Sequence, residues 1–165
     1  MIVVSDTTPL ISLMKVSLLD ILHSLFGEIR IPEAVYDELT INERYASEAD
    51  QIRNSSFIKR VTVQDKKTVM ILRNAAGLDI GESEAITYAE NLKAAILLMD
   101  EARGRKVAKS LDIPIMGTVG VLLSACRQGI LGKSEVEAAL DGLVAANCRI
   151  GKDVVEAAKR RLNDM

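Results

Sequence analysis

The sequence predicts an α/β fold in three layers, with helices on both faces of a mainly parallel sheet. Short apolar runs alternate with amphipathic segments along most of the chain, as expected when each strand is followed by a helix that returns to the same sheet. The sequence contains no repeat, no low-complexity tract and no flexible linker. With 165 residues, of which 48% are hydrophobic, the chain is long enough to bury one core without disulfides.

Five short apolar runs are predicted to be the strands of this sheet. They are Ile2–Val4, Glu28–Ile31, Phe57–Val63, Ala95–Met99 and Ile113–Met116. Among them, Ala95–Met99 is the clearest strand, because an uninterrupted aliphatic run of this length is typical of a strand that is buried on both faces.

Amphipathic segments between and after the strands predict helices. They cover Thr8–Val16, Leu18–Phe26, Pro32–Thr40, Asn42–Ser55, Asp65–Ala76, Gly81–Lys93 and Ala102–Leu111. Pro32 is predicted to occupy the first position of its helix, where a missing N–H is tolerated. From Val119 onward the pattern is helical, and Ser134 with Glu137 forms a capping-box signature.

Composition excludes several functions. The formal net charge is −2, so any contact with nucleic acid needs a local basic patch or a metal ion. With two Phe, three Tyr and no Trp, the protein lacks the aromatic platforms of single-strand-binding proteins. Cys126 and Cys148 lack CxxC spacing and are expected to be reduced packing thiols. Because the longest apolar run is Ala94–Met99 and no signal peptide is recognised, we expect a soluble, cytoplasmic protein without membrane contact.

Acidic residues follow two of the predicted strands directly. Asp6 ends the first apolar run and Asp100 ends the run Ala95–Met99. The carboxyl ends of parallel strands meet at one edge of the sheet, where ligands of such folds bind. We therefore expect both carboxylates at the same edge.

Two further acids lie toward the apolar faces of predicted helices. Glu82 is on the apolar stripe of its helix, whereas Glu84 lies off that stripe. Glu38 borders the apolar face of an earlier helix, and Asp37 points away from it. A carboxylate facing the core is unfavourable unless a cation neutralises it.

Each acid also has a purely structural interpretation. Asp6 and Asp100 could cap the helices that follow them, Glu82 could stabilise a first helical turn, and Glu38 could be a half-exposed surface residue. If all four converge, oxygen ligands favour Mg²⁺ or Mn²⁺ over zinc, since the single histidine, His23, is expected to be a packing or surface residue.

Basic residues follow Asp100 closely. Arg103, Arg105 and Lys106 could contact a phosphate backbone beside the metal, or could form an ordinary solvated helix face.

These segments, in this order, resemble the PIN-domain nucleases and, among them, a toxin-like prokaryotic subgroup. The resemblance rests on "DTTPLI" from Asp6, "IPEAVYDEL" ending near Glu38, "LDIGESEAITYA" containing Glu82, "AAILLMDEARGR" containing Asp100, and "GTVGVLLSACRQGIL" at Gly117–Leu131. It covers residues 1–131, so we interpret residues 132–165 as a helical extension packed on the nuclease domain.

The resemblance implies an endoribonuclease that depends on Mg²⁺ or Mn²⁺ and leaves 5′-phosphate and 3′-hydroxyl ends. It also implies RNA as the substrate, an antitoxin protein as a partner and a homodimer. The resemblance implies Asp6, Glu38, Glu82 and Asp100 as metal ligands with catalytic roles. It implies Thr8, Thr118 and Glu101 as supporting residues, and Arg103, Arg105 and Lys106 as RNA contacts.

Two other functions stay open at this stage. The chain could be a non-catalytic module of the same fold that binds RNA or a partner protein. It could also be a phosphatase-like or receiver-type domain that uses Asp6 and Asp100, although no lysine follows the predicted strand Ile113–Met116, as a receiver requires.

Overall fold

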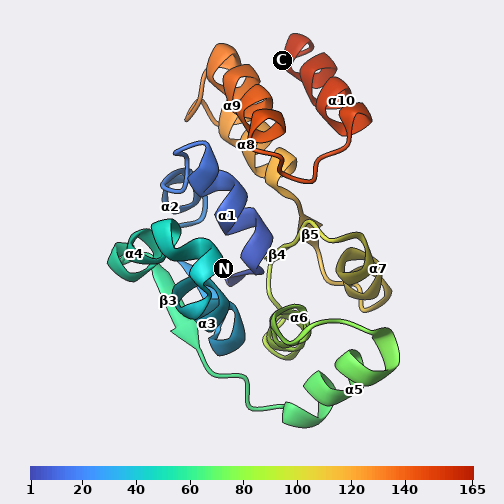
Figure 1. Cartoon of the computed structure of the whole chain (residues 1–165). Coiled ribbons are helices and arrows are strands. Elements are labelled where there is room, and N and C mark those ends of the chain that lie inside the picture. The colour runs from blue at the N-terminus through green and yellow to red at the C-terminus, as the bar shows by residue number, and fades with distance from the viewer.

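A computed structural model of residues 1–165 shows five parallel strands with helices on both faces of the sheet, which confirms the predicted fold class (Figure 1). Spatially the strands follow the order β3-β2-β1-β4-β5. Their bounds are β1 Val3–Ser5, β2 Ile29–Pro32, β3 Ile58–Val61, β4 Ile96–Leu98 and β5 Ile115–Met116.

Strand β1 is central, and the direction in which strands are added reverses beside it. β2 and β3 lie on one side of β1, while β4 and β5 lie on the other. Val4 pairs with Arg30 of β2 and with Leu97 of β4. The carboxyl ends of β1 and β4 are therefore neighbours at the switch point, where doubly wound sheets bind their ligands.

Ten α-helices and one 3₁₀ turn connect and cover the strands. They are α1 Thr7–Lys15, α2 Ile21–Phe26, α3 Glu33–Ile41, the turn η1 Glu43–Tyr45, α4 Ala46–Asn54, α5 Lys66–Ala76, α6 Ile80–Asn91, α7 Ala102–Ser110, α8 Thr118–Arg127, α9 Lys133–Ala145 and α10 Lys152–Asn163. Gly77 ends α5 with φ 68°, a conformation that glycine adopts without strain.

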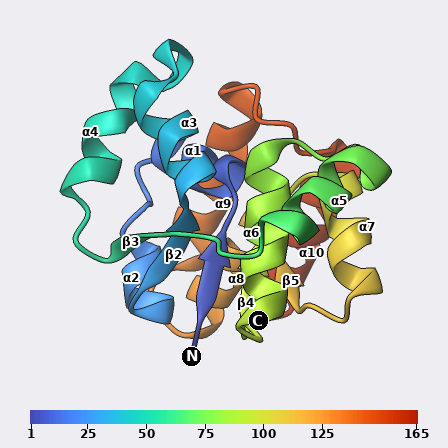
Figure 2. The ribbon, with the colours of Figure 1, turned by 90° about the horizontal axis from the view of Figure 1, so that it is seen from below.

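The sheet separates two apolar cores. Strand side chains alternate between its faces, so Val3 and Leu98 belong to the larger core while Val4, Leu97 and Met99 belong to the smaller one. Buried residues of α6 and α7 complete the smaller core, and α5 to α7 lie together on that side of the molecule (Figures 1 and 2).

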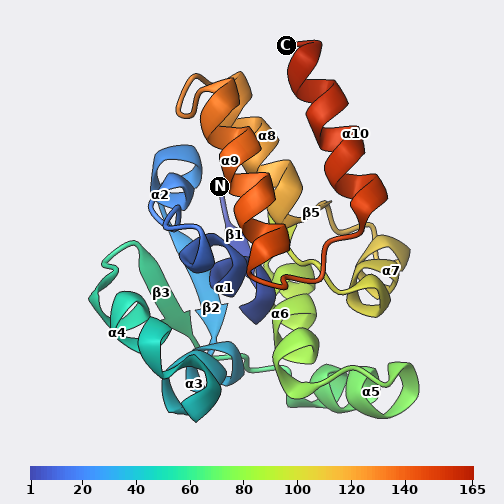
Figure 3. The same cartoon turned by 45° about the horizontal axis from the view of Figure 1, so that its top comes forward.

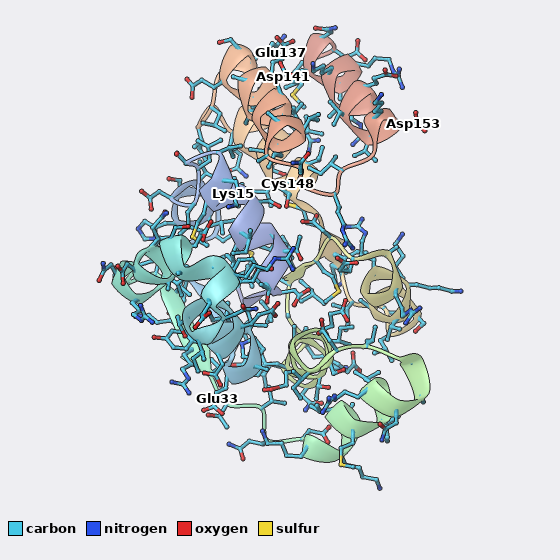
Figure 4. All side chains as sticks on the ribbon, viewed as in Figure 1. Lys15, Glu33, Glu137, Asp141, Cys148 and Asp153 are labelled. Carbon is cyan, nitrogen blue, oxygen red and sulfur yellow. The ribbon has the colours of Figure 1, made fainter.

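The C-terminal helices α8 to α10 pack together over the other side, next to α1 (Figure 3). Leu140 of α9 and Leu162 of α10 are fully buried members of the larger core. Lys159 of α10 donates a hydrogen bond of 2.8 Å to Asp141 of α9, which is labelled in Figure 4. Residues 132–165 thus share the core of the preceding helices.

Two predictions about helix starts are wrong. Pro32 is the N-cap of α3 and not its first residue, because it still pairs with Val61 as the last residue of β2. Helix α9 starts after Gly132, so Ser134 lies within the first turn and forms no capping box with Glu137. None of the helices combines the length and the apolar character needed to cross a bilayer.

Candidate metal centre at the sheet switch point

Asp6 lies directly after β1, at the N-cap position of α1, and is only 4% exposed. Its side chain makes no capping hydrogen bond, which excludes the helix-cap interpretation. Its backbone amide donates to the carbonyl of Leu98 at 3.0 Å, which fixes the end of β1 against β4. The Asp6 carboxylate is therefore buried at the switch point without a capping hydrogen bond to α1.

Glu38 of α3 approaches this position from another element. The Thr7 hydroxyl donates a hydrogen bond of 2.8 Å to Glu38 Oε2. A Cβ atom placed on Gly81 would be 3.6 Å from Glu38 Oε2 and 3.6 Å from Asp79 Oδ1. The missing side chain at Gly81 leaves a space between two acids that the sequence places far apart.

Glu82 also faces this region, but its carboxylate takes part in a capping box. Glu82 Oε2 accepts a hydrogen bond of 2.9 Å from the Asp79 amide, and Asp79 Oδ1 accepts one of 2.8 Å from the Glu82 amide. The side chain is buried, as its position on the apolar stripe predicted. The structural interpretation of Glu82 is thus observed, while its role as a metal ligand stays a prediction.

Asp100 is bound by the start of α8. Its Oδ1 accepts from the Thr118 amide at 2.8 Å, and its Oδ2 accepts from the Thr118 hydroxyl at 2.6 Å. It does not cap α7, since the N-cap of that helix is Glu101. A Cβ on Gly117 would be 2.8 Å from Asp100 Oδ1 and 3.0 Å from a terminal nitrogen of Arg105, so only glycine fits there without movement of these groups.

The electrostatics of Asp6 indicate a site that requires a cation. Burial raises the pKa of the Asp6 carboxyl to about 8, with further increases from Asp79, Glu82 and Glu38 and a partial decrease from the Thr7 amide. A carboxylate with several acidic neighbours is difficult to ionise in the folded protein unless a positive charge is present.

The pKa of Glu82 is raised as well. Burial raises its pKa first; the Asp79 amide lowers it, the charges of Asp79 and Glu101 raise it again, and Arg103 lowers it slightly. The charges of Glu101 and Arg103 thus act on Glu82 in opposite directions.

None of the predicted acids forms an ion pair, because no cationic nitrogen lies within 4.0 Å of their carboxylates. These acids are Asp6, Glu38, Glu82, Asp100 and Glu101. At the same time, no three acidic, histidine or cysteine side chains are close enough to bind one metal ion together. Buried, unneutralised oxygen donors suit Mg²⁺ or Mn²⁺ chemically, but a complete ligand set is not assembled.

The predicted RNA-contacting residues lie on α7, with different environments. Arg103 donates to the carbonyl of Gly77 at 3.2 Å, and Lys106 is exposed. Arg105 is half-buried and donates to the carbonyl of Met99 at 2.8 Å. Arg105 is therefore the only one of the three that is held beside Asp100.

Sequence reasoning missed two residues of the site. Thr7, and not Thr8, donates the hydrogen bond to Glu38; Thr8 is half-buried and makes no side-chain hydrogen bond within the protein. Asp79 was missed as well, although the spacing Asp79-x-x-Glu82 matches a capping box with aspartate at the N-cap and could have identified it.

Glu84 was predicted to lie off the core-facing stripe, and this is wrong. The side chain is buried, and its Oε1 accepts from the Ala34 amide at 3.4 Å. Helix α6 is covered on most of its circumference because it contacts both α3 and α5, so a single apolar stripe does not describe it.

The remaining candidate ligands lie elsewhere. His23 bonds the carbonyl of Gly27 at 2.7 Å and packs on Phe57. Cys126 and Cys148 are free and half-buried. None of these side chains joins the acidic residues.

Comparison with known proteins gives one match. A family model described as a PIN domain matches residues 2–164, which includes the C-terminal helices as well as the sheet. No curated protein and no solved structure gives a significant match.

Proposed function

Because the chain belongs to the PIN-domain family, whose members are typically nucleases that use divalent metals, we propose that it is a metal-dependent endoribonuclease. The observation that supports this most strongly is the burial of Asp6 among Glu38, Asp79 and Glu82 without any cationic partner. In the absence of metal such a cluster destabilises the fold, so its presence points to a binding function.

Within this proposal, Asp6, Glu38, Glu82 and Asp100 hold Mg²⁺ or Mn²⁺, with Glu101 as an additional ligand. The bound metal supplies an activated water and stabilises the charge that develops on the scissile phosphate. Hydrolysis leaves a 5′-phosphate and a 3′-hydroxyl.

The protein side chains have positioning roles. Thr118 fixes both oxygens of Asp100 through its amide and hydroxyl. The hydroxyl of Thr7 orients Glu38 through one hydrogen bond to Oε2, and Thr8 is proposed to orient a ligand or water. Arg105 is held beside Asp100, where a phosphate oxygen would find a positive charge.

Cleavage of single-stranded RNA by the purified protein tests this proposal. We expect products with 5′-phosphate ends in Mn²⁺ or Mg²⁺, and no product in EDTA or with the Asp6→Asn variant. Glu38→Gln should be inactive, while its matched control Asp37→Asn should stay active, because Asp37 points toward Arg60 at 3.9 Å and away from the site. Equal cleavage by wild type and Asp6→Asn, purified identically, would reject the site.

One observation favours a second candidate, a PIN-like module that binds RNA or a protein without cleaving. No three ligands are gathered for a metal in this structure. Calorimetric titration with Mn²⁺ distinguishes the two: binding that is lost in Asp6→Asn supports the nuclease, and no binding at millimolar Mn²⁺ supports the module.

We further propose that the protein acts as the toxin of a toxin–antitoxin pair and forms a homodimer. Supporting this is the resemblance of its motifs to the toxin-like subgroup. Co-purification with the product of an adjacent small gene, and the mass of the purified protein in solution, would test these two statements.

A further inference from the structure

A cleft lies between the sheet edge at β5 and the C-terminal helix α10, next to the proposed metal centre. Its volume is about 460 Å³, which is within the usual range of ligand-binding pockets. Asp100, Arg105 and Gly117 line it from the side of the proposed metal centre. It is also lined by Arg149 in the connection between α9 and α10 and by Arg161 on α10.

The charge of this cleft differs from that of the whole molecule. Three arginines and one aspartate line it, whereas the protein has a formal net charge of −2. Arg149 and Arg161 are exposed, and neither side chain has a carboxylate partner within 4.0 Å or a hydrogen bond to another residue. Their guanidinium groups are therefore available to an external anion.

Two helix N-termini add to the positive potential. Gly117 is the N-cap of α8 and Gly151 is the N-cap of α10, and both line the cleft. The Thr118 amide at the start of α8 already donates to Asp100, whereas no side chain caps the first turn of α10. Figure 3 shows the connection from α9 running to the start of α10 on the side of the molecule where β5 and α7 lie. Arginine forks and free first-turn amides are both groups that bind phosphate.

From this arrangement we propose that Arg149 and Arg161 bind two backbone phosphates of the RNA strand next to the scissile phosphate. The inference rests on the proposed nuclease function, because the cleft is continuous with that site through Asp100 and Arg105. A strand whose scissile phosphate lies at Asp100 is thereby guided between the sheet and α10. The C-terminal helices contribute to substrate binding in addition to completing the core.

RNA fits this surface better than an acidic protein segment does. Arginines from three different segments line the cleft, namely α7, the connection before α10 and α10 itself, and separate positive charges match the spaced phosphates of a single strand. The cleft also contains Asp100, whose negative charge repels both a carboxylate side chain and a phosphate. A metal ion that is shared between Asp100 and the RNA phosphate would neutralise this charge.

Fluorescence anisotropy with a labelled 12-nucleotide single-stranded RNA tests the proposal. The protein carries Asp6→Asn and the buffer contains EDTA, so binding is measured without cleavage. Arg149→Ala with Arg161→Ala should weaken binding roughly 10-fold, as expected for two exposed charged groups. The slope of log K against log salt should fall by about 1.4, or about 0.7 for each phosphate that the variant no longer neutralises.

The matched control combines Arg127→Ala with Arg160→Ala, which removes the same charge from exposed positions outside the cleft. Wild-type affinity in this control, with unchanged melting temperatures for both double variants, supports the cleft. Equal weakening by both pairs, or no weakening by either, overturns it. Arginine-dependent binding of a labelled polyglutamate peptide, with RNA affinity unaffected, also overturns it and assigns the surface to an acidic protein.

Cleavage assays separate this inference from the proposed function. Arginine-dependent RNA binding by a protein that never cleaves RNA in Mn²⁺ retains the cleft and rejects the nuclease. If wild type and the Arg149/Arg161 double variant cleave RNA equally and bind it with equal affinity, the nuclease proposal is supported and the role of the cleft is rejected.

Discussion

Replacing Asp6 with asparagine should stabilise the metal-free protein, although it should abolish cleavage. Asparagine has nearly the same shape as aspartate, so the packing after β1 is retained. The substitution removes the charge that is buried beside Glu38, Asp79 and Glu82 without a cationic partner. Stability and function therefore make opposite demands on this residue.

The magnitude follows from the pKa of Asp6, which is about 8 in the folded protein and 3.8 in an unperturbed chain. Between these values the folded state binds more protons than the unfolded state, so the free energy of unfolding decreases as the pH rises, by about 1.4 kcal/mol per pH unit. From pH 5 to pH 8 the loss amounts to roughly 3–4 kcal/mol, or a decrease in Tm of about 10 °C for a chain of this size. Asp6→Asn lacks this loss.

Thermal unfolding of both proteins in EDTA, from pH 5 to pH 8, measures the difference. We expect the Tm of the variant to exceed that of wild type increasingly as the pH rises. Asp20→Asn is the control, because Asp20 is exposed and makes no capping hydrogen bond. Added Mn²⁺ should raise the Tm of wild type at pH 8 and change that of Asp6→Asn much less, because ligands stabilise only the state that binds them.

Parallel pH profiles of wild type and Asp6→Asn would refute the reasoning. They would mean that Asp6 ionises in the folded protein as easily as in water, and that the acids around β1 do not require a cation.

Three further predictions concern the neighbouring structure. Gly104→Ala places a Cβ atom 2.5 Å from Met99 Sδ and should lower the free energy of unfolding by about 1–3 kcal/mol in urea titrations; an unchanged midpoint would show that Met99 moves aside. Thr118→Val removes the 2.6 Å hydrogen bond to Asp100 and should lower kcat in RNA cleavage about 10-fold or more. Thr118→Ser keeps the hydroxyl and should retain activity. Equal rates for both variants would contradict a positioning role. Burial raises the pKa of Glu48, but its hydrogen bonds and its partner Lys15 lower the pKa more. The ionised Glu48 therefore stabilises the fold at neutral pH, and this contribution is lost in acid. Glu48→Gln should lose less stability than wild type between pH 6 and pH 3, and identical losses would exclude the ion pair.

The fold was predictable because its signals are local. A continuous aliphatic run that is followed by a helix, such as β4, is typical of a buried parallel strand. In the same way, Gly77 indicates the end of α5. The helix starts were less predictable: Pro32 can end a strand or begin a helix, and its pairing with Val61 decides between them. That pairing depends on residues far along the chain.

The site was predictable in part for the same reason. Asp6 and Asp100 could be placed at one edge of the sheet, because each lies within two residues of the end of a strand and parallel strands end together. The burial of Glu84 depends on how α6 contacts α3, which no periodicity within α6 contains. Likewise, Arg149 and Arg161 reach the cleft only through the packing of α10, so the sequence presents them as ordinary surface charges.

The central position of β1 has a consequence for the order of folding. This strand is synthesised first, but its partner β4 comes from the second half of the chain, so one long edge of β1 stays open until β4 has been made. Such non-local pairing slows folding, and it delays the formation of the sheet edge at which Asp6 and Asp100 follow their strands. We therefore expect the sheet edge that carries the candidate site to form in a nascent chain only after β4 has left the ribosome.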